Sequence, residues 1–261
     1  MSFFKNLQIY DTEYTKIRIG PKKDGGYVVL SENIKNCNVL YSYGINDDVS
    51  FELDFVRVNP NCIIRLFDHT INELPEKNPS FNFIKEGIAS EKKVNLDTLE
   101  NHLYRFNDNL KFNKILKMDI EWNEWDVFEK MPNEIMCQFD QILCEFHFIP
   151  VFYEQNHSEY FTKFHKLIYE QINQQLFEKY QKVLNKIFDK FYLFHLHINN
   201  SLPVNKILNN EFPPLVEMSL VNKKIINHPR FTLFKYPIEN LDFPNKPYKS
   251  DIINFNWSIY K

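Results

Sequence analysis

Several apolar runs in the second half of the sequence end in carboxylate or imidazole side chains. Asp119 lies at the end of one run, Glu145 and His147 at the end of the next, and His195 and His197 in a third. Side chains two residues apart on a strand point to the same face, and the carboxyl ends of neighbouring parallel strands converge on one crevice. The sequence therefore predicts that Asp119, Glu145, His147 and His197 meet around one acceptor substrate or one metal ion.

A group of this composition can assist a reaction in two ways. His147 could remove a proton as a general base, with Asp119 and Glu145 as the other catalytic residues. Alternatively, Asp119, Glu145, His147 and His197 could bind Mn²⁺ or a similar divalent ion, or Mg²⁺ if the carboxylates dominate. A third possibility is that the histidines are only hydrogen-bonded core residues. The residue types alone do not decide among the three.

The sequence contains five glycines, all at or before position 87. Because glycine is this scarce, we expect it mainly where the backbone needs a positive φ or a close approach. Gly44 ends an apolar run and precedes Asn46-Asp47-Asp48, which suit the start of a helix. This is the strand-turn-helix at which α/β sheets receive nucleotide-like ligands. The full GxGxxG fingerprint is missing, which disfavours NAD and FAD.

A cofactor without phosphate groups can be held by fewer features. Asp68, after the next strand, is placed to accept hydrogen bonds from ribose hydroxyls, although it could equally be a cap or turn residue. Gly87 ends a further strand, where a small residue would let an adenine ring approach the backbone. The Asp24-Gly25-Gly26-Tyr27 segment is typical of a tight turn entering a strand. It could fold over the cofactor or be an unliganded hairpin.

Short β-rich runs alternate with segments of helical spacing, which is typical of βαβ units and a parallel sheet. We predict a doubly wound α/β fold with strands over 38–43, 63–67, 81–85, 115–120, 141–147, 192–198 and 215–220, and helices over 48–58, 96–106 and 121–130. Apolar residues recur every three to five positions over 158–191 and predict a long helix. Part of this helix could form a homodimer contact, or it could be a long surface helix.

The composition is that of a globular protein, because 44% of the residues are hydrophobic and 25% are charged. We expect a single domain over 1–261, with an N-terminal cap or hairpin (1–37), a core (38–220) and a C-terminal extension (221–261). The formal net charge of −3 disfavours nucleic acid as a partner. No secretion signal and no apolar run of transmembrane length occur, so we expect a cytoplasmic protein without membrane insertion.

Three groups of segments together resemble a known family. The first comprises Asp24-Gly25-Gly26-Tyr27-Val28-Val29 and Tyr41-Ser42-Tyr43-Gly44-Ile45. The second is Lys117-Met118-Asp119-Ile120-Glu121 with Glu124-Trp125, similar to D-I-E-G-x-E-W except that Trp122-Asn123 replaces the glycine and the next residue. The third comprises Glu145-Phe146-His147, the 193–200 segment, Glu217-Met218-Ser219 and the 241–245 segment. In combination they resemble the FkbM-related methyltransferase family over nearly the whole chain.

The resemblance implies a mostly parallel, seven-stranded class I (Rossmann-like) methyltransferase sheet that binds S-adenosyl-L-methionine (SAM). The expected cofactor-binding residues are Asp24, Gly25, Gly26, Tyr43, Gly44, Ile45, Ser50, Asp68, Gly87, Ile88 and Asp119. The resemblance also implies O-methylation of a sugar or nucleotide-activated sugar, such as a capsular heptose precursor, in surface polysaccharide biosynthesis. Glu121, Trp122, His195 and His197 would then contact this substrate, with Trp122 stacking on a sugar face.

Other functions remain open from the sequence. An N-methyltransferase acting on a small amine or phosphoamine would need a carbonyl-rich or aromatic cage rather than a base. A non-catalytic nucleotide-binding or assembly module would suit the long helix and the departure at Trp122-Asn123. A nucleotide-binding oxidoreductase is disfavoured by the missing GxGxxG.

Overall fold

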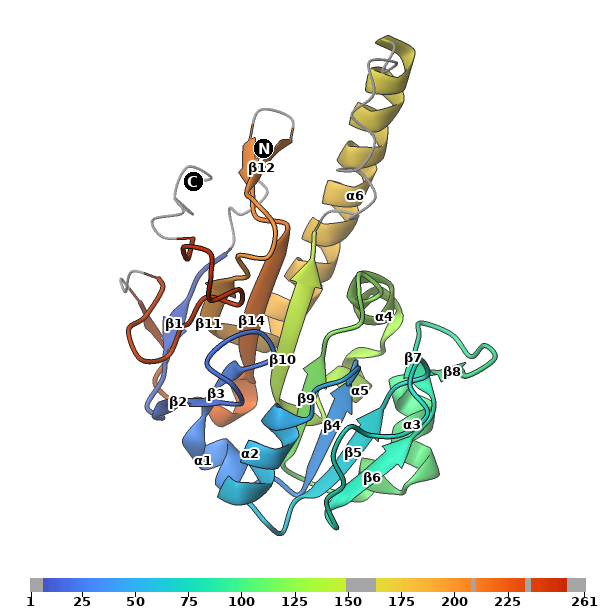
Figure 1. The fold of residues 1–261 in the computed structure, drawn as a ribbon, viewed down its shortest axis with the longest axis vertical. Helices are drawn as coiled ribbons and strands as arrows, with labels where there is room; N and C mark the ends of the chain where they lie inside the picture. The colour runs from blue at the N-terminus through green and yellow to red at the C-terminus, as the bar shows by residue number, and fades with distance from the viewer. Residues whose placement is uncertain (1–6, 149–162, 208–209, 233–235, 253–261) are drawn as a thin grey trace.

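The centre of the fold is a seven-stranded sheet with the order β11-β14-β10-β9-β4-β5-β6 (Figure 1). A computed structural model describes residues 7–148, 163–207, 210–232 and 236–252. The sheet strands are β4 (Val39–Tyr43), β5 (Ile63–Phe67), β6 (Phe81–Ile84), β9 (Lys114–Met118), β10 (Phe139–His147), β11 (Phe191–Ile198) and β14 (Leu215–Asn222). β14 pairs antiparallel with both β10 and β11, and the other neighbours pair in parallel. The predicted doubly wound, mostly parallel α/β sheet is confirmed.

Helices and short strand pairs surround this sheet. The helices are α1 (Ser31–Lys35), α2 (Ser50–Val58), α3 (Leu99–Arg105), α4 (Glu124–Lys130), α5 (Asn133–Met136) and α6 (Lys163–Lys190), with 3₁₀ turns η1 (Asp108–Leu110) and η3 (Lys223–Ile225). The pairs are β1 (Tyr10–Asp11) with β15 (Arg230–Phe231), β2 (Lys16–Ile19) with β3 (Tyr27–Leu30), β7 (Gly87–Ile88) with β8 (Leu96–Asp97), and β12 (Asn205–Ile207) with β13 (Asn210–Phe212). The helix predicted from residue 96 begins at Leu99, because Leu96 and Asp97 pair with β7.

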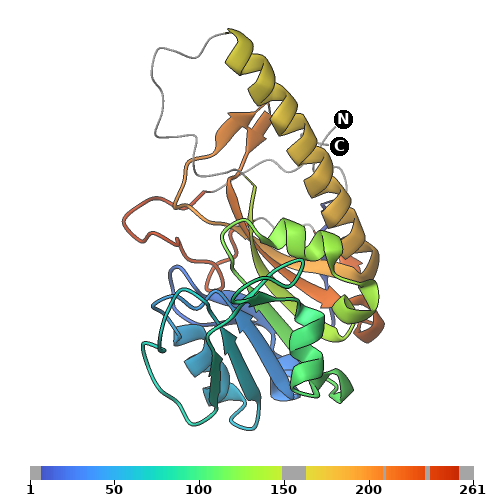
Figure 2. The ribbon, with the colours of Figure 1, turned by 90° about the vertical axis from the view of Figure 1, so that its right-hand side faces the viewer.

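Successive residues of the central strands point to opposite faces of the sheet and divide the core in two. On β4, Tyr41 and Tyr43 pack with residues of α3, α4 and α6, whereas Leu40 packs with residues of β2, β3, α1 and α2. Figures 1 and 2 show the β2–β3 hairpin, α1 and α2 on one face of the sheet and α3, α4 and α6 on the other. The central strands are buried on both faces, as predicted.

Buried hydrogen bonds fix the β2–β3 hairpin to the sheet. The side chain of Gln141 on β10 accepts a hydrogen bond from the backbone N of Leu30 (3.0 Å) and donates one to its carbonyl (3.4 Å). Ser219 Oγ on β14 donates to the carbonyl of Val28 (2.6 Å). The hairpin therefore holds its turn, which contains Asp24, beside the carboxyl ends of the central strands.

The long helix α6 packs on the fold through its second half. Tyr180, Leu184 and Ile187 are buried, and the Lys186 ammonium donates to the carbonyls of Phe128 (2.8 Å), Glu129 (3.0 Å) and Met131 (2.5 Å) at the end of α4. The first half extends beyond the sheet (Figures 1 and 2). The homodimer contact expected of this helix stays a prediction, and its first residues, 158–162, lie outside the described ranges.

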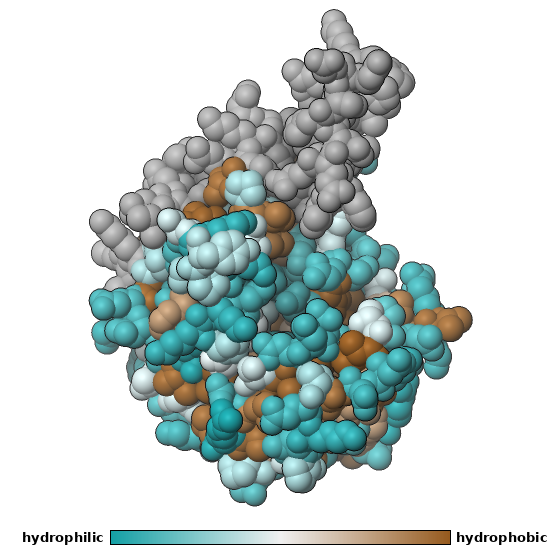
Figure 3. All heavy atoms as spheres, viewed as in Figure 1, coloured by the Kyte–Doolittle hydropathy of each residue, from teal (hydrophilic) through white to brown (hydrophobic). Residues whose placement is uncertain are grey.

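The described surface is mixed in character. On the face that carries the hairpin and α2, hydrophobic patches are separated by hydrophilic side chains (Figure 3). Within the described ranges, none of the helices combines the length and the hydropathy that crossing a bilayer requires.

Candidate functional site

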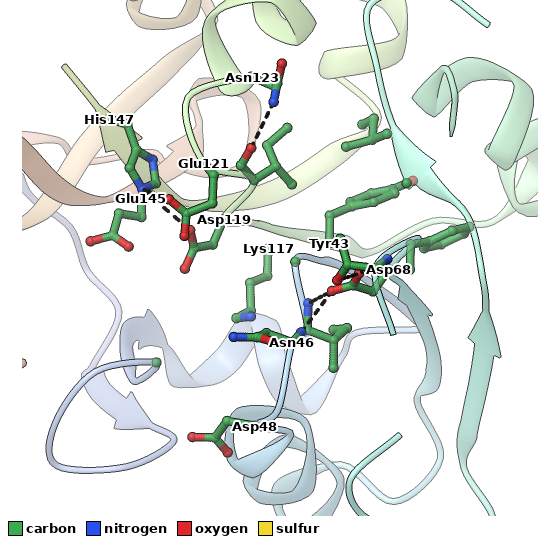
Figure 4. A pocket seen from close by; sticks show the side chains of 18 of the residues that line it. Tyr43, Asn46, Asp48, Asp68, Lys117, Asp119, Glu121, Asn123, Glu145 and His147 are labelled. Carbon is green, nitrogen blue, oxygen red and sulfur yellow. Dashed lines mark hydrogen bonds and ion pairs between the residues drawn. The ribbon is translucent and has the colours of Figure 1, made fainter. Parts of the chain in front are cut away.

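A cavity of about 900 Å³ opens at the carboxyl ends of β4, β5, β9 and β10. This volume lies in the usual range of small-molecule sites. Twelve of the predicted site residues line it: Asp24, Gly25, Tyr43, Gly44, Ile45, Asp68, Gly87, Ile88, Asp119, Glu121, Glu145 and His147. Figure 4 shows Asp119, Glu145 and His147 on one side of this pocket and Asp68 with Tyr43 on the other. The predicted residues Gly26, Ser50, Trp122, His195 and His197 do not contribute to its lining.

The turn after β4 depends on a close contact between two backbones. Gly44 has φ +78°, and a Cβ atom added to it would lie 1.6 Å from the carbonyl oxygen of Asp119 at the end of β9. Its N–H donates to the carbonyl of Phe67 on β5 (3.2 Å). Only glycine combines this conformation with this approach. The chain therefore turns directly over the ends of β5 and β9.

Asp68, at the end of β5, holds this turn in place. Its Oδ2 accepts hydrogen bonds from the backbone N of Ile45 (3.0 Å) and of Asn46 (2.9 Å). Its Oδ1 accepts from the N (2.7 Å) and Oγ1 (2.6 Å) of Thr70. Burial alone would raise the pKa of Asp68, but these hydrogen bonds outweigh it and lower the pKa below its ordinary value. The carboxylate is thus ionised and its acceptor sites are occupied by protein donors, so its ribose contact stays a prediction.

Asp119, Glu145 and His147 come together, as the sequence predicts. Each can offer a ligand atom within 4.8 Å of those of the other two. His147 Nε2 lies 3.3 Å from Glu121 Oε2 and 4.0 Å from Asp119 Oδ1. Its Nδ1 lies 3.2 Å from Oε1 of Glu124, a fully buried residue of α4. The imidazole is therefore enclosed by carboxylates.

These charges shift one another's protonation. Burial by itself would lower the pKa of His147, but hydrogen bonds to Glu121 and Glu124 outweigh burial and raise that pKa to about 11. Withdrawal from bulk water raises the pKa of Asp119 to about 6, although the charge of His147 opposes the shift. Burial and the nearby Asp119 charge raise the pKa of Glu145 well above its ordinary value. The group can therefore hold or release a proton near neutral pH at Asp119.

His197 lies away from this group, contrary to the arrangement predicted from the sequence. β14 is inserted between β10 and β11, so that Glu217 stands opposite Glu145 on one side and His197 on the other. His197 Nδ1 lies 3.2 Å from Glu217 Oε2, and its Nε2 lies 3.2 Å from Asp251. His195 is also buried and bonded, with its Nε2 2.7 Å from Asp242 Oδ1. Both histidines hold the segment after β14 rather than facing the cavity.

Trp122 also differs from its expected position on the substrate side. It has φ +80° and packs against the core beside α4 and α6, outside the cavity lining. This conformation favours glycine and costs a bulky residue about 1–3 kcal/mol. It explains why the related motif has a glycine at the position of Trp122. Glu124 Oε1 offsets part of that cost by accepting from the backbone N of Ile120 (2.9 Å).

The lining also contains residues that the sequence did not single out as site residues, among them Lys117, Asn199, Asn245 and Lys246. Asn199 Nδ2 donates to Glu145 Oε1 (2.6 Å). Asn245 Nδ2 donates to Asp24 Oδ1 (3.0 Å) and to Glu217 Oε1 (2.5 Å). The 241–245 segment was part of the resemblance, but no local pattern places its end at the cavity. Lys117 and Asn199 also lie within the quoted segments, so these two could have been found from the sequence.

A second group of possible metal ligands in the described part of the chain is Glu86, Asp97 and His102. Arg105 already bridges it, with hydrogen bonds to Glu86 and to Asp97 Oδ2 (2.9 Å). His102 is stacked on Phe67, with ring centroids 4.4 Å apart. This group is an ion-pair network behind the β5 side of the cavity.

Comparison with known proteins agrees with this architecture. The model of the methyltransferase FkbM domain matches residues 8–183, about two thirds of the chain. The sheet and its cavity therefore belong to a methyltransferase. The chain is a member of the FkbM methyltransferase family, as the resemblance indicated. A search of curated proteins found no match. The matched range ends within α6, before β11 and β14.

Replacing Gly44 by alanine should disrupt the site. Both Gly44 and Gly25 have positive φ, but a Cβ at Gly25 would meet its nearest atom only at 3.7 Å. We expect Gly25→Ala to cost about 1–2 kcal/mol of unfolding free energy. Gly44→Ala should cost about 3 kcal/mol or more, because the backbones of β4 and β9 must separate. Denaturant unfolding measures both variants, and equal losses would contradict the close contact.

Stability should depend on pH through His197. Burial would lower its pKa, but Asp251 and Glu217 raise it to about 10, from about 6.5 in the unfolded chain. The stabilisation is therefore complete below pH 6.5, declines above it, and is lost as the pH rises through 10. We expect His197→Gln to cost about 3 kcal/mol at pH 6 and much less above pH 10.

The titratable groups around His197 also include Asp242 and His195. For that reason the comparison needs unfolding curves of the wild type and the variant at each pH, not at one pH alone. His228→Gln, at an exposed position, serves as control and should stay within about 0.5 kcal/mol throughout. A loss for His197→Gln that is the same at pH 6 and pH 10 would contradict the prediction.

Proposed function

We propose that this protein transfers the methyl group of SAM to a hydroxyl group of a sugar or nucleotide-activated sugar. The observation that carries the proposal is the division of the cavity into two unlike sides. The glycine turn with Asp68 and Gly87 lies on one side, and Asp119 with Glu145 and His147 on the other. A ligand spanning the cavity would place its nucleoside on the first side and its reactive end at the second.

The residues of the first side suit the binding of SAM. The close backbone turn at Gly44 leaves no Cβ in the way, and Gly87, Ile88 and Ala89 line the cavity where an adenine ring would lie. Without a GxGxxG turn, this side suits a nucleoside that carries no pyrophosphate. SAM supplies a methyl group on a positively charged sulfur, and carboxylates around the cavity favour that charge.

On the second side, Asp119 is the group best able to accept the proton of an acceptor hydroxyl. Its side chain is 29% exposed to the cavity and, among the described residues, no hydrogen bond to it occurs. Both nitrogens of His147 lie within 3.3 Å of a carboxylate oxygen. His147 is therefore assigned to positioning and charge balance rather than to the general-base role first considered. Alignment of the hydroxyl with the methyl group supplies the rest.

A divalent cation is a second way for the same group to act. Asp119, Glu145 and His147 offer the mixed carboxylate and imidazole donors that suit Mn²⁺ or Mg²⁺. Such an ion would lower the pKa of the acceptor hydroxyl. It would have to displace the proton of His147 and its contact with Glu121. Activity that is lost with a chelator and restored by Mn²⁺ would assign the group to the metal.

The lining near Asp119 favours an acceptor with many hydroxyl groups. Asn199, Asn245 and Lys246 line the cavity together with Asp24 and Glu145, and such groups can both donate to and accept from sugar hydroxyls. An amine acceptor would need an aromatic or carbonyl-rich cage. Trp122, an aromatic residue near this side, packs into the core instead.

Two measurements test the proposed reaction. Calorimetric titration should show binding of SAM and of its product S-adenosylhomocysteine (SAH), and no binding at millimolar cofactor would refute the assignment. Methyl transfer from labelled SAM should then be measured with nucleotide-activated sugars, sugar phosphates and small amines. We expect turnover with a hydroxyl acceptor, whereas turnover confined to amines would establish the N-methyltransferase alternative.

Asp119→Asn should lower turnover by about two to four orders of magnitude, because the amide cannot accept the proton. SAH should still bind, since the amide keeps the shape of the side chain. Glu121→Gln is the matched control, because Glu121 also contacts His147 but its side chain is 83% exposed; it should have a much smaller effect. Loss of turnover in His147→Gln with near-normal turnover in Asp119→Asn would identify His147 as the base.

A further inference from the structure

Lys117 is a buried cation that the proposed reaction does not use. It lies on β9 two residues before Asp119, and its side chain is only 6% exposed. Its Nζ is 5.8 Å from the ring centroid of Tyr27 and 5.7 Å from that of Phe51. An ammonium carries three donors, and burying a charge without partners is costly. The burial of this lysine therefore suggests that its charge has a function in the site.

The nearest carboxylate, Glu52, forms an ion pair with Lys117 but no hydrogen bond. Glu52 Oε1 lies 3.5 Å from the Lys117 Nζ, beyond the usual hydrogen-bond distance. That oxygen already accepts a hydrogen bond from Ser42 Oγ at 2.5 Å. Within the described ranges, no hydrogen bond from the Lys117 ammonium is formed. Because Lys117 lines the cavity, its free donors are available to a bound ligand.

The direction of the side chain points to one part of the cavity. In Figure 4, Lys117 extends away from the carboxylates of Asp119 and Glu145, toward the turn that carries Asn46. The other lysines of the lining are Lys23, Lys93 and Lys246, and all three are more exposed than Lys117. Lys93 pairs with Glu91 and Lys246 with Asp24. Lys117 therefore provides a buried positive charge beside the glycine turn, in a cavity whose lining has more carboxylates than ammonium groups.

We propose that Lys117 binds the α-carboxylate of the methionine part of SAM. The inference rests on the proposed function, which places the nucleoside beside Asp68 and Gly87. From there the methionine part must pass Gly44 to reach the end of β9, where Lys117 lies. The α-carboxylate is the only anionic group of SAM at neutral pH. The acidic residues nearby would repel it, whereas they favour the sulfonium and the α-amino group.

The test compares two ligands that differ in this group. SAH contains the α-carboxylate, and 5′-methylthioadenosine contains the same adenosyl thioether but lacks the amino-acid part. Lys117→Met should weaken SAH binding by about 10- to 100-fold, the effect of one charge-assisted hydrogen bond. It should change the affinity for 5′-methylthioadenosine by less than about twofold. Calorimetric titration of both ligands measures the difference.

Two further variants separate binding from folding. Lys114→Met removes another buried ammonium from the same strand, at a residue that is 1% exposed and outside the cavity lining; SAH affinity should not change. Glu52→Gln combined with Lys117→Met removes both charges, so that no buried carboxylate is left unpaired. This double variant should fold and show the same selective loss of SAH affinity.

Each outcome has a distinct meaning. If the wild-type protein binds neither ligand, the proposed function fails. If the wild type binds SAH and Lys117→Met binds it equally well, the role of Lys117 is refuted while cofactor binding stands. Equal weakening of both ligands would show a structural role and also refute it. If Lys117→Met weakened the binding of a sugar phosphate but not of SAH, Lys117 would bind the acceptor substrate, and the assignment would be overturned.

Discussion

The close contact between Gly44 and the carbonyl of Asp119 is the constraint on which the site depends. It brings the turn after β4 over the end of β9, so the sides proposed for the cofactor and for the acceptor share one wall. Asp68 completes the turn by accepting hydrogen bonds from the N–H groups of Ile45 and Asn46. A side chain at position 44 would separate the two strands at the point where the proposed chemistry takes place.

Charge is distributed around this contact in an uneven way. Carboxylates surround His147, while the ammonium of Lys117 lies buried two residues before Asp119, 3.5 Å from Glu52 and without a hydrogen bond to any described residue. Such an arrangement is costly, because like charges and buried donors without hydrogen bonds are held close together. A ligand that carries both positive and negative groups would relieve both costs at once. This charge distribution supports the proposal of a zwitterionic ligand such as SAM.

Much of the fold could be predicted from the sequence, together with three of the four residues expected to meet: Asp119, Glu145 and His147, but not His197. Buried strands, scarce glycines and the Glu145-Phe146-His147 pattern are local signals, and local signals determine which residues lie at strand ends. His197 could not be placed, because its position depends on β14 entering the sheet between β10 and β11. The position of the Trp122 side chain could not be predicted for a related reason. Its side chain follows a left-handed backbone conformation that no aromatic residue would suggest.

The wall of the cavity near the acceptor has a separate origin along the chain. Asn199, Asn245 and Lys246 come from segments after α6, outside the range matched by the family model. They are joined to the hairpin turn through Asp24, whose backbone N donates to the carbonyl of Asn245 (3.2 Å). The family model therefore covers the glycine turn and the end of β10 but not these three residues. Two proteins can share the matched range and still differ in this wall, so membership of the family does not fix the molecule that is methylated.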